Sequence, residues 1–321
     1  MKGSQIQKLS SWVGIDICKA QLDLFSNHPD LKLPASVPNN PTGHQKLLGL
    51  IDKLPEVKII FEATGGYEKP LLLTLQKEQI YATRINPSQV RSFAKAKGLL
   101  AKTDKIDAQL LAHYGSIFTP DTTLPIDPEL DELQDLIKYR RHIRNQLHRE
   151  KMQLEHEHSK VVTTFIRRRL TSLQNQLESL TKTITEKARN SEALRPALET
   201  LTTVKGVADF TATSLLAAMP ELGTLTRKQA SALAGVAPIN CDSGEMRGRR
   251  KTYGGRSEIR QALYMAAVVS SRFEPILRDF YQNLLKNGKP KKLALTAVMR
   301  KLLIHLNSLM RKHLEEVSAA S

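Results

Sequence analysis

Four acidic residues, placed at the ends of predicted strands and at the start of a predicted helix, constrain this chain more than any other feature. Asp16 lies near the end of one apolar run, and Glu62 directly follows another. Asp104 and Asp107 stand three residues apart at the start of a predicted helix, so both side chains project from one face of its first turn. A fold that unites these segments gathers four carboxylates at one place.

The order of the predicted elements indicates the fold class. The run 57–61 is nearly all apolar, as expected for a strand covered on both faces. Three strands, then helix, strand, helix, strand and helix is the order of an RNase H-like α/β fold, which we predict for residues 1–125. The expected strands are 12–17, 21–25, 31–37, 57–61 and 80–85, with helices over 41–54, 67–79 and from 88 onward.

These acids fit a metal site, although each also has an ordinary interpretation. An acid at the end of a buried strand is costly unless a partner compensates its charge. Mg²⁺ prefers hard oxygen ligands, and a pair of metal ions about 3.5–4 Å apart can activate an attacking oxygen and stabilise a leaving one. The four acids together therefore indicate a magnesium site that cuts a nucleic acid backbone. Taken singly, Asp104 and Asp107 suit the start of any helix, Asp16 a turn, and Glu62 a surface strand end.

The net charge points to a polyanionic partner. The 321 residues carry a formal charge of +16, and duplex DNA or RNA is the commonest partner for such a surplus. An anionic membrane is the alternative, but no uninterrupted apolar stretch reaches about 20 residues, and residues 1–10 lack the apolar core of a signal peptide. Cys18 and Cys241 fit no zinc spacing. We therefore expect a soluble cytoplasmic protein with no membrane partner.

Residues 126–190 are predicted to form a long helical arm. Glycine is absent from 128–190, and between Lys138 and Arg169 ten Lys or Arg stand against three Glu. We expect this arm to pair protomers and to contact a nucleic acid backbone through cations that include Arg140, Arg141 and Arg144. Steps of four and three residues separate the members of a predicted coiled-coil seam: Ile166, Leu170, Leu173, Leu177, Leu180 and Ile184.

The remaining residues, 191–321, are predicted to be mainly helical. Residues 199–237 read as helix, glycine-bearing hairpin with Lys205, and helix. This order resembles a helix-hairpin-helix module that holds a phosphate through backbone N–H groups, although an ordinary helical hairpin gives the same pattern. A polar loop follows, in which Ser243-Gly244 is first of all a turn signal. A serine can also attack phosphorus once its proton affinity is lowered, and the loop supplies cations that suit phosphate: Arg247, Arg249, Arg250 and Lys251.

Taken together, these motifs resemble the transposases of the IS-one-ten group, relatives of the Piv DNA invertase, over nearly the whole chain. The Lys-Thr-Asp-x-x-Asp segment 102–107 is the most specific of them, and it adds Lys102 and Lys105 to the candidate cations. The other carriers are Gly14-Ile15-Asp16, Phe61-Glu62-Ala63-Thr64-Gly65, Leu233-Ala234-Gly235-Val236-Ala237-Pro238, Ser243-Gly244 with its basic loop, and the segment 260–267.

The resemblance implies a RuvC-like catalytic domain in which an Asp-Glu-Asp-Asp tetrad binds Mg²⁺, or Mn²⁺ as a substitute. By position the tetrad is Asp16, Glu62, Asp104 and Asp107. The resemblance also implies that Ser243 attacks a DNA phosphate and is held covalently while strands exchange, with Ser257, Ser270 and Ser271 as nearby alternatives. Donor and target DNA, a structured bridge RNA and a homo-oligomer, dimer or tetramer, are the implied partners.

Two other functions fit the same residues. A hydrolytic nuclease such as a junction resolvase has the same four acids and uses water as the nucleophile. A non-catalytic nucleic-acid-binding protein uses the acids only as helix caps. Phosphate contacts alone do not separate DNA from RNA.

Overall fold

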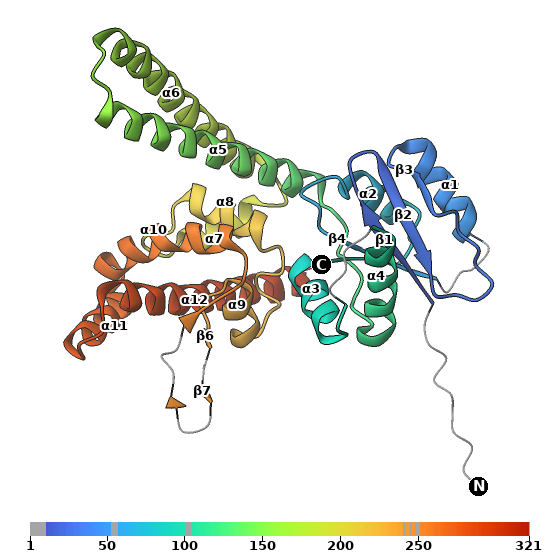
Figure 1. Ribbon diagram of the computed structural model, residues 1–321. Coiled ribbons are helices and arrows are strands. Elements are labelled where there is room, and N and C mark those ends of the chain that lie inside the picture. Colours follow the sequence, from blue (N-terminus) through green and yellow to red (C-terminus); the bar gives the residue numbers. More distant parts are fainter. Residues whose placement is uncertain are drawn as a thin grey trace. The chain divides into compact units, whose positions relative to one another are not determined.

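The computed structural model describes residues 11–52, 57–99, 104–239, 242–243, 246–247 and 251–320. For residues 104, 105, 239, 242–243, 246–247, 251 and 320 the description covers the backbone only. The chain divides into two compact units, Met1–Ile126 and Asp127–Ser321 (Figure 1). The helices predicted as a separate arm belong to the second unit.

The first unit is built on a mixed five-stranded sheet with the order β3-β2-β1-β4-β5. β1 is antiparallel to β2 and parallel to β4, and β4 is parallel to β5. The elements follow one another in the predicted order, although the third strand is shorter than expected. The strands are β1 (Trp12–Ile17), β2 (Gln21–Ser26), β3 (Ser36–Pro38), β4 (Lys58–Glu62) and β5 (Ala82–Ile85).

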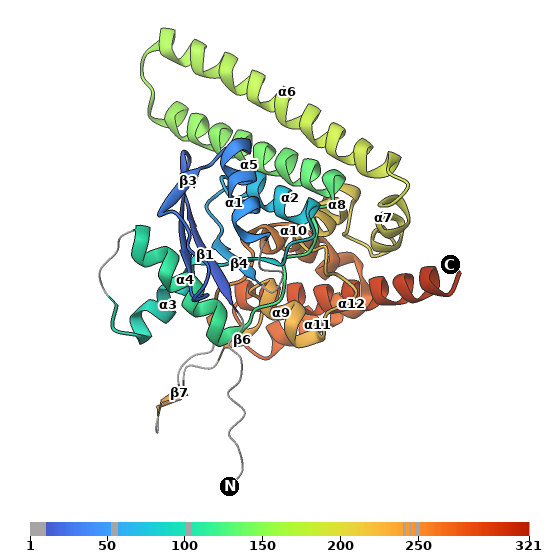
Figure 2. The ribbon, with the colours of Figure 1, turned by 90° about the vertical axis from the view of Figure 1, so that its right-hand side faces the viewer.

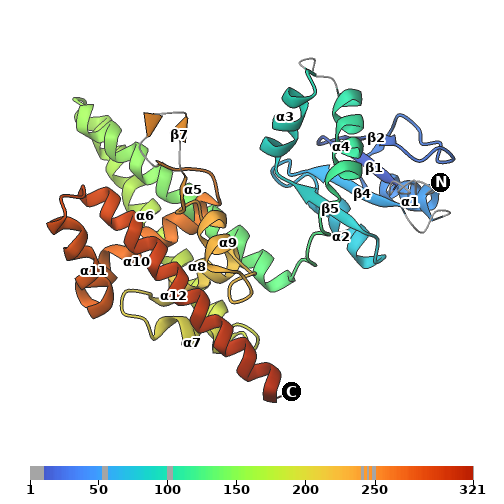
Figure 3. The ribbon, with the colours of Figure 1, turned by 90° about the horizontal axis from the view of Figure 1, so that it is seen from below.

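Helices cover both faces of this sheet, as the apolar run in β4 requires. Ile59 and Phe61 pack with α1 (Pro41–Ile51) and α2 (Lys69–Lys77), whereas Ile60 packs with α3 (Pro87–Ala96) and α4 (Asp104–Phe118). Figure 3 shows α3 and α4 on one side of the sheet and α2 on the other. Successive side chains of a strand therefore enter two different cores.

A glycine allows α4 to approach β1 closely. A Cβ atom built on Gly14 would lie 2.6 Å from the backbone nitrogen of Ala112 and closer still to the carbonyl oxygen of Ala108. One turn further along α4, a Cβ on Gly115 would lie 2.5 Å from the ring of Trp12. Helix and strand thus touch backbone to backbone, which fixes the position of α4 along β1.

We expect Gly14→Ala to destabilise the first unit by about 1–3 kcal/mol, because the clashing atoms are backbone and have no rotamer to change. Trp12 is the single tryptophan of the chain and is fully buried in this unit, so its fluorescence during urea unfolding reports on the first unit alone. Gly49→Ala is the matched control: outside the backbone of its own helix, no atom of the described residues lies within 4 Å of its Cβ position, and alanine favours a helix. Equal unfolding midpoints for the two variants would contradict this packing.

The second unit is helical apart from short strand pairs near Ser243. Its largest elements are two long helices that form a hairpin and a 30-residue C-terminal helix (Figure 2). The helices are α5 (Pro128–His156), α6 (Lys160–Asn190), α7 (Arg195–Thr202), α8 (Asp209–Ala218), α9 (Arg227–Leu233), α10 (Ser257–Phe273), α11 (Pro275–Lys286) and α12 (Lys291–Ala320). The short strands are β6 (Pro238–Ile239), β7 (Asp242–Ser243), β8 (Met246–Arg247) and β9 (Lys251–Thr252).

The predicted seam of α6 is covered inside the chain. Ile166, Leu173 and Ile184 are buried, and so is Ile143 on the facing helix α5. The periodicity therefore predicted the buried side of α6 correctly, but α5 of the same chain covers it. Pairing of protomers through this seam gains no support from these residues.

The helix α12 is a core helix. It is long and apolar enough to cross a membrane by length and composition, and among the described helices it alone is so. One side of it lies in the core of the second unit, where Val298, Leu302, Leu303 and Leu306 are fully buried, whereas Leu293, Leu314 and Val317 are exposed. Its composition is therefore explained by the core that it forms.

Candidate active site

The sheet places Asp16 and Glu62 side by side at the carboxyl ends of two parallel strands. The register pairs Ile15 with Phe61, so one further step brings Asp16 level with Glu62. Gly14 faces α4 and Ile60 packs in the core beneath α3 and α4. Because residues two apart in a strand point to the same face, both carboxylates project toward the α4 side.

The helix α4 brings Asp104 and Asp107 to the same edge. It runs antiparallel to β1, since Trp12 meets Gly115 and Gly14 meets the turn from Ala108 to Ala112. Two further strand residues advance about 6.6 Å, the length of roughly four helical residues, and so reach the first turn of α4. That turn holds both aspartates.

The four acids are the ligand type that a divalent cation prefers. The described side chains among them are not close enough together to enclose such an ion. Asp16, Glu62 and Asp107 are all partly exposed, and carboxylate oxygens are the ligands that Mg²⁺ prefers. Within the described part of the chain, no group of three or more His, Cys, Asp or Glu side chains could hold a metal ion. The side chain of Asp104 lies outside the described residues, and so does all of Lys102; Lys105 is described by its backbone only.

The register adds a carboxylate that the sequence patterns did not indicate. Asp23 on β2 is the direct cross-strand partner of Asp16, and its side chain accepts a hydrogen bond from Gln21 Nε2 at 2.7 Å. Like charges directly opposite each other destabilise an antiparallel pair. A cation bound nearby would relieve this repulsion. Partial alternation in 21–25 was visible in the sequence, but only the strand register shows which residue Asp23 opposes.

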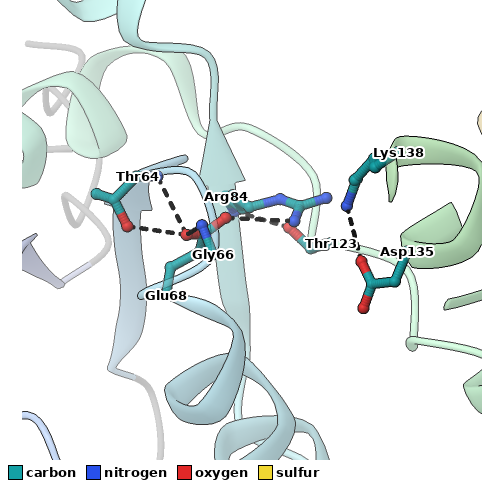
Figure 4. Close-up of polar contacts among 7 residues, drawn as sticks. All are labelled: Thr64, Gly66, Glu68, Arg84, Thr123, Asp135 and Lys138. Carbon is teal, nitrogen blue, oxygen red and sulfur yellow. Dashed lines mark hydrogen bonds and ion pairs between the residues drawn. The ribbon is translucent and has the colours of Figure 1, made fainter. Parts of the chain in front are cut away.

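Glu68 fixes the loop that follows Glu62. Its Oε2 atom accepts hydrogen bonds from Thr64 N at 3.1 Å, Thr64 Oγ1 at 2.8 Å and Gly66 N at 2.8 Å (Figure 4). Arg84 lies 3.6 Å from its other carboxylate oxygen. Burial raises the pKa of this carboxyl, but the hydrogen bonds from the loop outweigh that effect and leave the pKa below its usual value. No local sequence pattern indicated Glu68, because its role depends on hydrogen bonds to the loop that the fold brings against it.

Ser243 lies at the end of β7 in a short β-ribbon. Ser243 pairs with Met246, and Asp242 pairs with Arg247. Closer to the helices, β6 pairs with β9. The backbone of Ser243 and of the cations Arg247 and Lys251 is described, but their side chains are not; Arg249 and Arg250 lie outside the described residues.

The root of this ribbon is firmly held. Arg256 donates to both carboxylate oxygens of Glu221, at 2.9 and 2.8 Å, and to the carbonyl oxygen of Ala218 at 2.8 Å. Burial raises the pKa of Glu221, but the Arg256 guanidinium outweighs it, and the pKa falls below its usual value. Gly235 has a φ of +65°, and a Cβ there would strike the backbone of Gly254. Strands β6 and β9 therefore leave the helices in a defined direction.

Burial separates the alternative serines from one another. Ser270 is fully buried and donates to the carbonyl oxygen of Lys205 at 2.7 Å, and Ser271 is buried and donates to that of Val268 at 2.9 Å. Ser257 is exposed and donates to Glu258 at 3.1 Å. Neither Ser270 nor Ser271 is placed to meet a DNA phosphate.

The three predicted arginines of α5 have partners inside the second unit. Arg140 donates to Thr181 Oγ1 at 2.6 Å, and its guanidinium carbon lies 4.1 Å from the centre of the Phe210 ring. Burial and the nearby charge of Arg144 lower the pKa of Arg140. Arg141 pairs with Glu258 at 2.6 Å and Arg144 donates to Gln261 at 3.1 Å, whereas Lys205 is exposed. These arginines join α5 to α6, α8 and α10.

Two family models match this chain, and the first of them extends from the first unit into the second. A model of DEDD transposases of the IS110 type matches residues 13–161, and a model described as "Transposase IS116/IS110/IS902 family" matches residues 198–282. The chain is 28% identical over 312 residues to the pilin gene-inverting protein of Moraxella bovis, covering 94% of this chain and 96% of that one. The protein of the same name from Moraxella lacunata is 28% identical over 313 residues, with the same coverage. With matches in both units, this chain belongs to the IS110 family of transposases.

Proposed function

We propose that this transposase cleaves and rejoins DNA by a metal-assisted attack of Ser243 on a phosphate, with Asp16, Glu62, Asp104 and Asp107 as the metal-binding set. The observation that carries the proposal is the meeting of β1, β4 and the first turn of α4 at one sheet edge. The strand order and this edge support a RuvC-like first unit. The pilin gene-inverting relatives support DNA as the substrate.

The four acids would bind the metal from two sides. Asp16 and Glu62 project from adjacent strands and would bind from the sheet side, while Asp104 and Asp107 would bind from the helix side. A divalent cation held by these acids would supply positive charge to the scissile phosphate and to the oxygen that leaves it. Glu68 and Gly14 would position the acids without binding the metal, since Glu68 fixes the loop after Glu62 and Gly14 sets the position of α4.

The serine step conserves the phosphate ester. The Ser243 Oγ–phosphorus bond forms as the bond from phosphorus to one deoxyribose oxygen breaks; the serine proton leaves, and the departing oxygen takes up a proton. A second deoxyribose hydroxyl then attacks the same phosphorus and releases the serine. One ester replaces another at each step, so rejoining needs no external energy source.

The other predicted cations are proposed to contact nucleic acid. Arg140, Arg141 and Arg144 join α5 to neighbouring helices, and they stay among the proposed phosphate contacts, with Arg144 exposed. A structured guide RNA and a dimer or tetramer remain part of the proposal. The remaining cations are Lys102, Lys105, Lys205, Arg247, Arg249, Arg250 and Lys251.

The test uses the purified protein with the nucleic acid that copurifies with it, whose sequencing supplies the DNA ends and any guide RNA. With Mg²⁺ and labelled DNA of that sequence, we expect a protein–DNA species that survives denaturation and is absent when EDTA replaces the metal. Cut DNA without such a species would assign the protein to the hydrolytic nucleases. Neither cleavage nor adduct, with binding intact, would assign it to the non-catalytic binders.

A further inference from the structure

An asparagine bridges the two loops that follow Asp16 and Glu62. Asn39 lies between β3 and α1, and its Nδ2 atom donates to the carbonyl oxygens of Cys18 at 2.9 Å and of Tyr67 at 3.1 Å. Cys18 directly follows β1, and Tyr67 lies in the loop after β4. A side-chain amide has two N–H hydrogens, so each carbonyl takes one.

His44 orients this amide. Its Nε2 atom lies 2.9 Å from Asn39 Oδ1. Because Nδ2 supplies the donors to both carbonyls, Oδ1 is the acceptor and His44 donates its Nε2–H. The ring is 3% exposed on the inner side of α1, and burial lowers its pKa, which favours the neutral form. The backbone N–H of Asn39 also donates to Ala20 at 2.9 Å, so the residue is held on three sides.

The bridge lies where the pairing of β1 with β4 ends. The last pair of that register is Ile15 with Phe61, directly before the two carboxylates. Two carboxylates at neighbouring strand ends repel each other, and the repulsion pushes those ends apart. A neutral amide that binds both following loops opposes this separation without adding charge. Glu68 holds the second loop independently, at Thr64 and Gly66.

We propose that Asn39 is a positioning residue that sets the spacing of Asp16 and Glu62 and thereby the affinity of this edge for a divalent cation. The inference rests on the proposed function and adds a residue that acts through the loop backbones. Loss of an outer-shell partner of a metal site commonly costs 10–100-fold in affinity. An effect of that size is expected here.

The experiment measures Mn²⁺ binding to the full-length protein without DNA, by electron paramagnetic resonance of the free ion. Asn39→Ala is expected to weaken Mn²⁺ binding about 10–100-fold. Asn39→Asp keeps the acceptor for His44 but replaces the donating NH₂ by an oxygen. Its added negative charge would by itself attract the ion, so weaker binding in this variant also must come from the lost donors.

The matched control acts at the opposite end of the same strand. Asn27 Oδ1 accepts the backbone N–H of Trp12 at 2.7 Å, so Asn27→Ala also removes a side-chain bridge to β1. It is expected to lower thermal stability, followed by Trp12 fluorescence, while Mn²⁺ affinity stays unchanged. Equal weakening in Asn27→Ala and Asn39→Ala would overturn the positioning role, and so would unchanged binding in Asn39→Ala. Unchanged Mn²⁺ binding in Asp16→Asn would instead overturn the proposed metal site itself.

Discussion

Ser243→Ala should abolish the covalent protein–DNA adduct and leave DNA binding intact. The variant lacks the only atom of that side chain able to bond phosphorus, while the backbone pairing of Ser243 with Met246 does not depend on the hydroxyl. The measurement is denaturing gel electrophoresis of labelled DNA after incubation with Mg²⁺, beside a gel-shift titration under native conditions. Strand exchange should disappear together with the adduct, because the phosphoserine ester from which the strands are rejoined is never formed.

Ser257→Ala serves as the control for this variant. Ser257 is exposed at the start of α10 and its hydroxyl donates only to neighbouring Glu258 among the hydrogen bonds of the described residues, so the adduct should form at the normal level. An adduct that persists in Ser243→Ala and vanishes in Ser257→Ala would move the nucleophile to α10. Ser270 and Ser271 need no such test as nucleophiles because both are buried.

Asp16→Asn should lower DNA cleavage by more than about 100-fold, the upper end of what removal of an outer-shell partner costs. Asparagine has nearly the same shape as aspartate, so the fold of β1 is kept while one negative charge and one strong oxygen ligand are lost. Cleavage of labelled DNA at several Mg²⁺ concentrations measures the loss. DNA binding should not weaken, because removing a carboxylate from a phosphate-binding edge reduces repulsion.

Asp30→Asn is the control for the charge change, since Asp30 is exposed between β2 and β3. It should cleave DNA at the normal rate. Normal cleavage by Asp16→Asn would make Asp16 an ordinary strand residue and contradict the proposed metal site at this edge. Glu62→Gln should behave like Asp16→Asn, because the register places the two side chains level with each other.

Local sequence patterns predicted the helices and strands of this protein better than they predicted which elements pack against each other. The apolar run before Glu62 indicated a strand buried on both faces, and the structure places Ile60 and Phe61 in two different cores. The spacing of Ile166 and Ile184 indicated the buried side of α6, but periodicity carries no information about which helix covers it. Here the covering helix is α5 of the same chain.

Roles that depend on distant residues could not be predicted in this way. Arg140 reads as a free cation in a basic helix, yet it packs on Phe210, which lies 70 residues later. No sequence pattern indicated Asn39, because its bridge to Cys18 and Tyr67 exists only after the sheet has formed. Gly14 is a glycine in a predicted strand, a pattern typical of close backbone approach. The sequence does not indicate that α4 is the element that approaches.

The α5–α6 hairpin gives the second unit a fixed reach. α5 has 29 residues, which at 1.5 Å per residue make it about 43 Å long. It lies against the core from Leu133, which is buried, to Arg144, which contacts α10, and the rest of the hairpin extends away from that core (Figures 1 and 2). Duplex DNA rises about 3.4 Å per base pair, so the extending residues 145–156, about 18 Å long, span about 5 base pairs. The length of the hairpin would therefore set how far from the core its far end contacts DNA. Shortening both helices by seven residues would move that contact inward by about three base pairs.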